Sequence, residues 1–125
     1  MADDFRNIET KHGVPPANKR RLNVIIEDGN GEIIGYASGL TNRKWMYLSD
    51  LWIHEKIRGQ GHGAKILNIL ENDARAIGIT HMHTQTTGFD RNDLFYLKQG
   101  YEIAATFENF FDVERGHHFI LTKKL

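Results

Sequence analysis

The segment of this sequence with the clearest chemical potential lies at residues 58–63, which read Arg-Gly-Gln-Gly-His-Gly. An apolar run at 48–53 precedes it, and apolar residues at helical spacing follow it from Ile66. A glycine-rich turn that joins a strand to a helix points several backbone N–H groups at one place, where the unpaired first turn and the helix dipole favour an anion. The segment therefore predicts a phosphate-binding turn. The alternative is a tight connection that binds no ligand.

Two well-known phosphate motifs do not fit this turn. A P-loop needs a lysine followed by serine or threonine after its last glycine, whereas Ala64 and Lys65 follow Gly63. The dinucleotide-binding fingerprint needs the spacing G-x-G-x-x-G, whereas the glycines here stand at 59, 61 and 63. The turn therefore predicts neither a nucleoside triphosphatase nor a dinucleotide-binding domain.

Hydrophobic patterning predicts the elements that hold this turn. Alternating residues at 22–27 and 33–37 flank the turn residues Asp28-Gly29-Asn30-Gly31, which predicts a hairpin. A third strand is expected at 45–54, leading into the glycine-rich turn. The helix after the turn is predicted to run to about Ala76 or Ile77 and to be stopped by Gly78. Its apolar residues draw one stripe at the 3.6-residue period, made of Ile66, Leu67, Leu70, Ala74 and Ile77.

The second half of the chain predicts one strand at 79–85, a helix beginning near Asp90 and closed by Gly100, and a final strand pair at 101–107 and 118–125. Residues 1–20 are expected to form an irregular arm, or a short helix followed by a bend. The order of elements favours an α/β (α+β) fold in which a mixed sheet is flanked by two main helices. The chain is too short for a doubly wound fold with six parallel strands.

Composition narrows the class of protein. A length of 125 residues with 40% hydrophobic residues predicts a single domain over 1–125. Sixteen basic residues balance sixteen acidic ones, so we expect no binding to nucleic acid or to an anionic membrane. With no cysteine, the chain has no disulfide and no thiol nucleophile. The apolar runs are short and broken by charge, which predicts a soluble cytoplasmic protein.

The glycine-rich turn resembles the acetyl-CoA signature Q/R-x-x-G-x-G/A of the GNAT superfamily of N-acetyltransferases, with Arg58, Gly61 and Gly63 at its fixed positions. A second segment, at 94–101, resembles the family's second signature, in which Tyr96 belongs to an aromatic pair and Tyr101 follows a glycine. The two signatures occur in the family's order, and the resemblance covers about 22–125. The chain therefore resembles a small single-domain GNAT enzyme.

The resemblance implies a mostly antiparallel sheet with a splayed central strand, and acetyl-CoA as cosubstrate. Backbone N–H groups of the turn would hold the CoA pyrophosphate, Arg58 would add a charge-assisted contact or hold the turn, and backbone groups at 51–53 would pair with the pantetheine arm. The residues that the resemblance assigns to CoA are Leu51, Trp52, Ile53, Arg58, Gly59, Gln60, Gly61, His62, Gly63, Ala64 and Asn92.

For catalysis, the resemblance makes Tyr96 the proton donor to the departing thiolate, although a plain core tyrosine is the alternative. The positions where some members carry a basic Glu or His hold Tyr47 and Ser49, and neither is a competent base at neutral pH. Asp50 is adjacent to Ser49 but faces the other side unless a bulge reorients it. Ordered water, or an acid of the loop 108–114, could take the proton instead.

Histidines also raise the question of a metal site. His81 and His83 share one strand face, and His117 is adjacent to His118, but no carboxylate or third histidine completes a ligand set. We therefore expect no bound metal.

The acceptor is the least determined part of the prediction. Phe107, Phe110 and Phe111 stand among Glu108, Asp112 and Glu114 in a loop that suits a cationic amine, or serves only as a hydrophobic anchor. A small-molecule primary amine is the first choice, and a protein lysine or N-terminus is the second. The groove is expected to be open or completed by a second subunit of a homodimer. A catalytically inactive CoA-binding module and a structural domain without a CoA site are the remaining alternatives.

Overall fold

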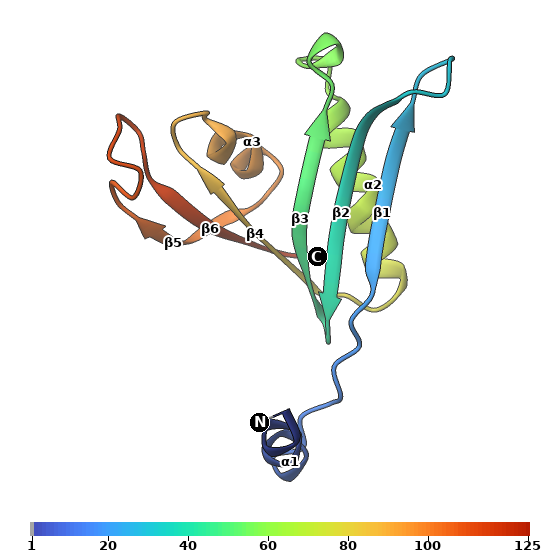
Figure 1. The fold of residues 1–125 in the computed structure, drawn as a ribbon, viewed down its shortest axis with the longest axis vertical. Coiled ribbons are helices and arrows are strands. Elements are labelled where there is room, and N and C mark those ends of the chain that lie inside the picture. The colour runs from blue at the N-terminus through green and yellow to red at the C-terminus, as the bar shows by residue number, and fades with distance from the viewer. Residues whose placement is uncertain (1) are drawn as a thin grey trace.

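The structure, a computed structural model, describes residues 2–125, which form a six-stranded sheet, helices that pack on it and an N-terminal helix that stands apart (Figure 1). The strand order is β1-β2-β3-β4-β6-β5, which confirms the predicted mixed sheet and excludes a doubly wound fold. The elements are α1 (Ala2–Lys11), β1 (Arg21–Glu27), β2 (Ile33–Asn42), β3 (Trp45–Ile53), a 3₁₀ turn η1 (Glu55–Ile57), α2 (His62–Ala76), β4 (His81–Thr87), α3 (Asn92–Lys98), β5 (Glu102–Phe107) and β6 (His118–Lys124).

The first three strands form an antiparallel arm. The predicted hairpin joins β1 to β2, and its turn is held by Asp28, whose Oδ1 accepts hydrogen bonds from the backbone N–H groups of Asn30 and Glu32. β2 continues to Asn42, well past the predicted end at Ala37, because residues 38–40 keep pairing with both neighbouring strands although Ser38 and Gly39 interrupt the apolar pattern.

The sheet opens between its third and fourth strands. β3 and β4 are parallel and paired only over Trp45–Tyr47 and His81–His83, and beyond these residues they diverge (Figure 1). The chain thus forms two arms, β1-β2-β3 and β4-β6-β5, that meet at one end and separate at the other. This opening confirms the splayed central strand that the resemblance implied.

α2 packs its predicted stripe against the first arm (Figure 1). Ile66, Leu67, Leu70 and Ala74 are fully buried, in the same cluster as Met46 of β3. Burying an Ile or Leu side chain contributes about 1.5–3 kcal/mol, so the stripe fixes the helix firmly on the sheet. The stripe does not extend to Ile77 as expected. This residue is exposed because the helix ends at Ala76.

The start of α3 differs from the prediction and its end agrees. Asp90 does not cap the helix: Arg91 occupies the cap position with a left-handed backbone, and the helix begins at Asn92. Gly100 follows the helix with φ +90°, a conformation that favours glycine and stops the helix as predicted.

The N-terminal segment is helical over α1 and irregular over 12–20, so the short helix, not the wholly irregular arm, is the correct alternative. α1 stands away from the sheet in Figure 1. Arg43 connects it to the body through an ion pair with Glu9 and a hydrogen bond to the carbonyl oxygen of Pro15. None of the helices described for 2–125 is long and apolar enough to cross a membrane.

Candidate functional site

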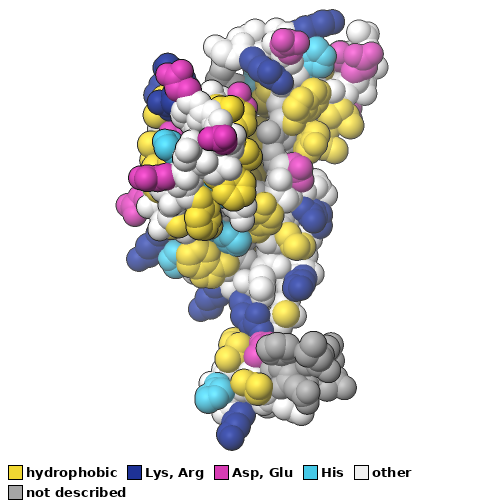
Figure 2. All heavy atoms as spheres, turned by 60° about the vertical axis from the view of Figure 1, so that its left-hand side comes forward, with side chains coloured by type: hydrophobic (Ala, Val, Ile, Leu, Met, Phe, Trp, Pro, Cys, Tyr) yellow, Lys and Arg dark blue, Asp and Glu magenta, His cyan; other side chains and the backbone are white. Residues whose placement is uncertain are grey.

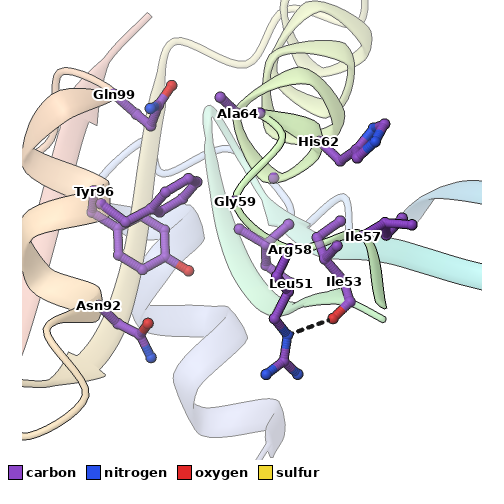
Figure 3. Close-up of a pocket in the computed structure, with 13 residues that line it drawn as sticks. Leu51, Ile53, Ile57, Arg58, Gly59, His62, Ala64, Asn92, Tyr96 and Gln99 are labelled. Atoms are coloured by element: carbon purple, nitrogen blue, oxygen red, sulfur yellow. Dashed lines mark hydrogen bonds between the residues drawn. The ribbon is translucent and has the colours of Figure 1, made fainter. Parts of the chain in front are cut away.

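A cavity of about 510 Å³ lies at the opening between the two arms, where β3, the start of α2 and α3 meet (Figure 3). Most of its lining surface is apolar, and the polar groups gather at the start of α2 and on α3. It is lined by Leu51, Ile53, Ile57, Arg58, Gly59, Gly61, His62, Gly63, Ala64, Asn92, Phe95, Tyr96 and Gln99.

The polar end of the cavity is the first turn of α2. Gly59 and Gly61 have φ values of +77° and +84°, which L residues adopt only with strain. Gly61 is the cap residue, has no side-chain capping bond, and its carbonyl oxygen accepts the first helical bond, from Lys65. The N–H groups of 62–64 therefore lack helical partners and can bind an anion.

The turn is also shaped for the close approach of a ligand. A Cβ added to Gly63 would lie 3.3 Å from the Phe95 ring, so a larger residue would crowd the cavity wall. Nε of Arg58 donates a 2.9 Å hydrogen bond to the carbonyl oxygen of Ile53 (Figure 3). Of the two roles predicted for Arg58, holding the turn is therefore the one for which the structure provides a contact.

A bulge in β3 decides which of its side chains face the cavity. Ser38 pairs with Asp50 and Gly39 pairs with Leu48, so Ser49 is the extra residue. Beyond the bulge, the side chains of Leu51 and Ile53 point to the α2 side of the sheet and line the cavity. Asp50 is turned to the opposite, outer face, together with Tyr47, as expected if a bulge was present.

Tyr96 is a buried tyrosine in the wall of the cavity. It projects from α3, is 8% exposed, and points its hydroxyl toward β3 in Figure 3. Burial raises the pKa of Tyr96, the phenol of Tyr47 raises it further, and Thr84 acts in the opposite direction. The hydroxyl therefore keeps its proton at neutral pH, which is the state a proton donor needs.

Ser49 lies next to the opening but is held in a hydrogen-bond network. Its Oγ accepts a 2.7 Å bond from Arg21 and lies within bonding distance of the Ser38 carbonyl oxygen and of Oδ2 of Asp50. Through these contacts, the side chain of Ser49 stabilises the bulge. Asp50 is exposed on the outer face.

The cavity gathers every residue predicted to bind CoA except Trp52 and Gln60. The side chain of Trp52 lies on the outer face, where its ring centroid is 5.9 Å from that of Tyr36, because alternation along β3 turns it away. Gln60 is exposed at the tip of the turn. These two side chains therefore do not line the site, although their backbone remains beside it.

Three lining residues were not predicted: Ile57, Phe95 and Gln99. Phe95 is the other member of the aromatic pair with Tyr96, so the second signature contained a signal for it. Gln99 lies one turn beyond Phe95, and this helical spacing could have placed it on the same face. Ile57 carries no such signal because its position depends on the 3₁₀ turn after β3.

An aromatic cluster lies on the second arm, at the end of β5, in the loop after it and at the start of β6. Phe107, Phe110 and Phe111 are all exposed and surround His118, with ring centroids 5.4–6.2 Å from it. Figure 2 shows hydrophobic and histidine side chains on this side of the molecule with acidic side chains around them. A cationic group is the ligand that such a surface suits.

The described residues contain no group of three or more His, Cys, Asp or Glu side chains that could hold a metal ion. His81 and His83 do share one face, and each packs against an aromatic ring of β3.

Comparisons with known proteins agree with this geometry. Residues 3–101 match the profile of the Acetyltransferase (GNAT) family. The curated Acetyltransferase Atu2258 of Agrobacterium fabrum (strain C58 / ATCC 33970) is 34% identical over 74 residues. That match covers 59% of this chain and 54% of the other protein, so the chain matches only about half the length of this relative.

Solved structures extend the similarity to the whole fold. An acetyltransferase from Bacillus cereus ATCC 14579 superposes with a TM-score of 0.81 at 20% identity, covering 99% of this chain and 89% of its own. A GNAT family acetyltransferase from Elizabethkingia anophelis with acetyl-CoA bound gives a TM-score of 0.67 at 22% identity, covering 78% of this chain and 72% of its own. At these identities the likeness shows the fold.

Proposed function

This chain belongs to the GNAT acetyltransferase family, and we propose that it transfers an acetyl group from acetyl-CoA to the primary amine of a small molecule. The observation that carries the proposal is the cavity in which the unpaired first turn of α2 lies opposite the protonated hydroxyl of Tyr96. One end can bind a phosphate and the other can protonate a leaving thiolate.

The walls between these ends suit the rest of CoA. Leu51 and Ile53 offer apolar side chains, and the backbone of β3 beyond Tyr47 is not paired with β4. Unpaired strand edges bind extended chains through main-chain hydrogen bonds, so the amide-containing pantetheine arm can lie along β3 as another strand would. Asn92, at the start of α3, adds a polar side chain to the opposite wall.

Acetyl-CoA supplies the activated acetyl group, and the residues of the chain orient it and manage protons. Tyr96 donates a proton to the thiolate as the C–S bond breaks. The mostly apolar lining offers water few hydrogen-bond partners, and water would otherwise compete with the amine.

The acceptor amine is proposed to approach from the outer face, where the bulge has placed Asp50. The acidic and aromatic loop 108–114 borders the same side of the second arm and favours a cation. An aminated antibiotic, a polyamine or an amino acid fits this chemistry. A protein lysine or N-terminus is the second candidate, and a homodimer that completes the groove stays a prediction.

A second function, a CoA-binding module without catalysis, is favoured by one observation. Tyr47 and Ser49 occupy the positions of the family's strand-borne bases, and Ser49 is held by Arg21. If no other group accepts the amine proton, the protein would bind acetyl-CoA and turn it over poorly.

The experiment combines binding with turnover. The thermal midpoint is measured with acetyl-CoA, CoA and ATP, and thiol release is then followed with spermidine, kanamycin, L-lysine and a lysine-containing peptide. A ligand at a hundredfold its Kd adds about 2.7 kcal/mol, a shift of several degrees for a domain of this size. We expect acetyl-CoA and CoA, but not ATP, to raise the midpoint, and a small amine to release thiol. Binding without turnover would support the inactive module, and no binding would overturn both functions.

A further inference from the structure

His83 lies at the point where the two arms of the sheet separate. It belongs to the last residue pair that joins β3 to β4, opposite Tyr47, and the two ring centroids are 5.1 Å apart. Both side chains lie on the outer face, away from α2, because they alternate with the buried Met46 and Met82. These two rings therefore border the opening on its outer face.

The next residue of β4 connects this point to the other face. Oγ1 of Thr84 donates a 2.9 Å hydrogen bond to the carbonyl oxygen of Leu48 and spans the two strands as they begin to part. Thr84 is buried on the α2 side and lies close enough to Tyr96 to influence its hydroxyl. Because consecutive residues of a strand point to opposite faces, His83 lies on the outer side of the opening and Thr84, a neighbour of Tyr96, lies on the inner side.

The protonation state of the His83 ring suits a proton acceptor at this position. Burial lowers the pKa of His83, so the imidazole is neutral at pH 7 and can accept a proton. The ring is also partly exposed, so it is accessible from solvent on the outer face. The other titratable or charged side chains on this face are Arg21 and Glu27 of β1, Tyr36 of β2, Tyr47 and Asp50 of β3, His81 of β4, Glu102 of β5, and His118 and Lys124 of β6. Because these side chains carry charges of both signs, burial is the dominant influence on the pKa of His83.

We propose that His83 is the catalytic base of the transfer: it accepts the proton of the attacking amine on the outer side of the opening while Tyr96 protonates sulfur on the inner side. The proposal rests on the proposed acetyltransferase function and supplies the base that Tyr47 and Ser49 do not.

Atoms and charges balance in this step. The neutral amine nitrogen forms a bond to the acetyl carbonyl carbon and the C–S bond breaks. One N–H proton passes to a ring nitrogen of His83, and the hydroxyl proton of Tyr96 passes to the CoA sulfur. His83 then releases its proton to water and Tyr96 regains one from water, which leaves an amide, free CoA and both residues in their starting states.

His81 provides a matched control on the same strand face. It stacks on Trp45 with ring centroids 4.5 Å apart, and its Nδ1 lies 2.8 Å from Oγ1 of Thr80. It is two residues farther from the opening than His83, at the start of β4. Replacing His81 therefore changes a similar aromatic stack without removing the proposed base.

The test compares wild type, His83→Gln and His81→Gln, using the panel amine that wild type acetylates fastest. We expect His83→Gln to lower kcat about a hundredfold or more, the usual contribution of a general base, while the acetyl-CoA Kd and the thermal midpoint stay near wild type. His81→Gln should stay within about threefold of wild type, since no proton transfer depends on it.

The pH profile gives a readout that a structural role would not produce. Below the pKa of His83 both the amine and the imidazole must lose a proton, so log kcat should rise with pH with a slope of about two in wild type and about one in His83→Gln. Added imidazole should also raise the rate of His83→Ala but not that of His81→Ala.

The outcomes separate the two proposals. If wild type binds acetyl-CoA but acetylates none of the amines, the proposed function fails and the base assignment fails with it. If wild type is active and His83→Gln matches His81→Gln in rate and pH slope, only the assignment of His83 is overturned.

Discussion

The hydroxyl of Tyr101 donates a 2.8 Å hydrogen bond to Oε2 of Glu71, a buried carboxylate of α2 that also receives a 2.8 Å bond from Nζ of Lys123 at Oε1. Tyr101 leads into β5 and Lys123 lies in β6, whereas α2 packs on the first arm. The three side chains therefore join the helix that begins at the glycine-rich turn to the second arm, whose strands β5 and β6 follow Tyr96. Their contacts help to set the distance between the two ends of the cavity.

Removing the Tyr101 hydroxyl should destabilise the protein. In Tyr101→Phe the Oε2 atom of Glu71 loses its donor inside the protein, and an unsatisfied buried acceptor costs about 1–3 kcal/mol. Urea unfolding measures the loss. Tyr36→Phe is the control, because Tyr36 is 38% exposed and its change should stay within about 0.5 kcal/mol. Equal stabilities of the two variants would contradict the role of the hydrogen bond.

Stability should fall at alkaline pH because of the same residue. Burial first, and then the charge of Glu71, raise the pKa of Tyr101 above its ordinary value. Near pH 10 and above, the unfolded chain loses this proton while the folded chain keeps it, so the free energy of unfolding decreases as pH rises, by up to about 1.4 kcal/mol per pH unit. The contribution is fully present below pH 10. Denaturation curves between pH 8 and 11 should show a shallower decline for Tyr101→Phe than for wild type, and parallel curves would exclude this cause.

Tyr96→Phe should separate catalysis from binding. The ring and its packing against Phe95, with centroids 5.1 Å apart, are preserved while the proton donor is lost. We expect kcat to fall about a hundredfold and the Kd for acetyl-CoA, measured by calorimetry, to change little. An unchanged kcat would remove Tyr96 from the mechanism. A large change in Kd would instead indicate that its hydroxyl serves in binding.

Gly61→Ala should weaken acetyl-CoA binding. The left-handed backbone of Gly61 costs a residue with a Cβ about 1–2 kcal/mol, so the turn would either lose stability or shift its N–H groups away from the phosphate. A shift that costs 1.4 kcal/mol of binding corresponds to about a tenfold higher Kd. Gly29→Ala is the matched control, since Gly29 has open space around it and no positive φ. Equal Kd values for both variants would argue against a phosphate site at this turn.

Sequence patterns determined the parts of this protein that depend on neighbouring residues. The apolar period of α2 identified its buried stripe, and Gly100 identified the end of α3. The order of glycines at 59–63 and the aromatic pair around Tyr96 identified both ends of the cavity. In each case the backbone conformation, or the face that packs, follows from residues within a few positions of one another.

Tertiary structure alone decided which distant residues meet. The bulge at Ser49 turned Asp50 to the outer face, and strand register brought His83 against Tyr47. Because side chains alternate with a period of two, a shift of one residue in pairing reverses every face, and a single sequence contains no local record of that register. Tyr101 and Glu71 are thirty positions apart and polar, so nothing in the hydrophobic pattern links them. The two side chains meet only because α2 and the second arm pack together. Once both are buried, each supplies the hydrogen-bond partner that the other requires.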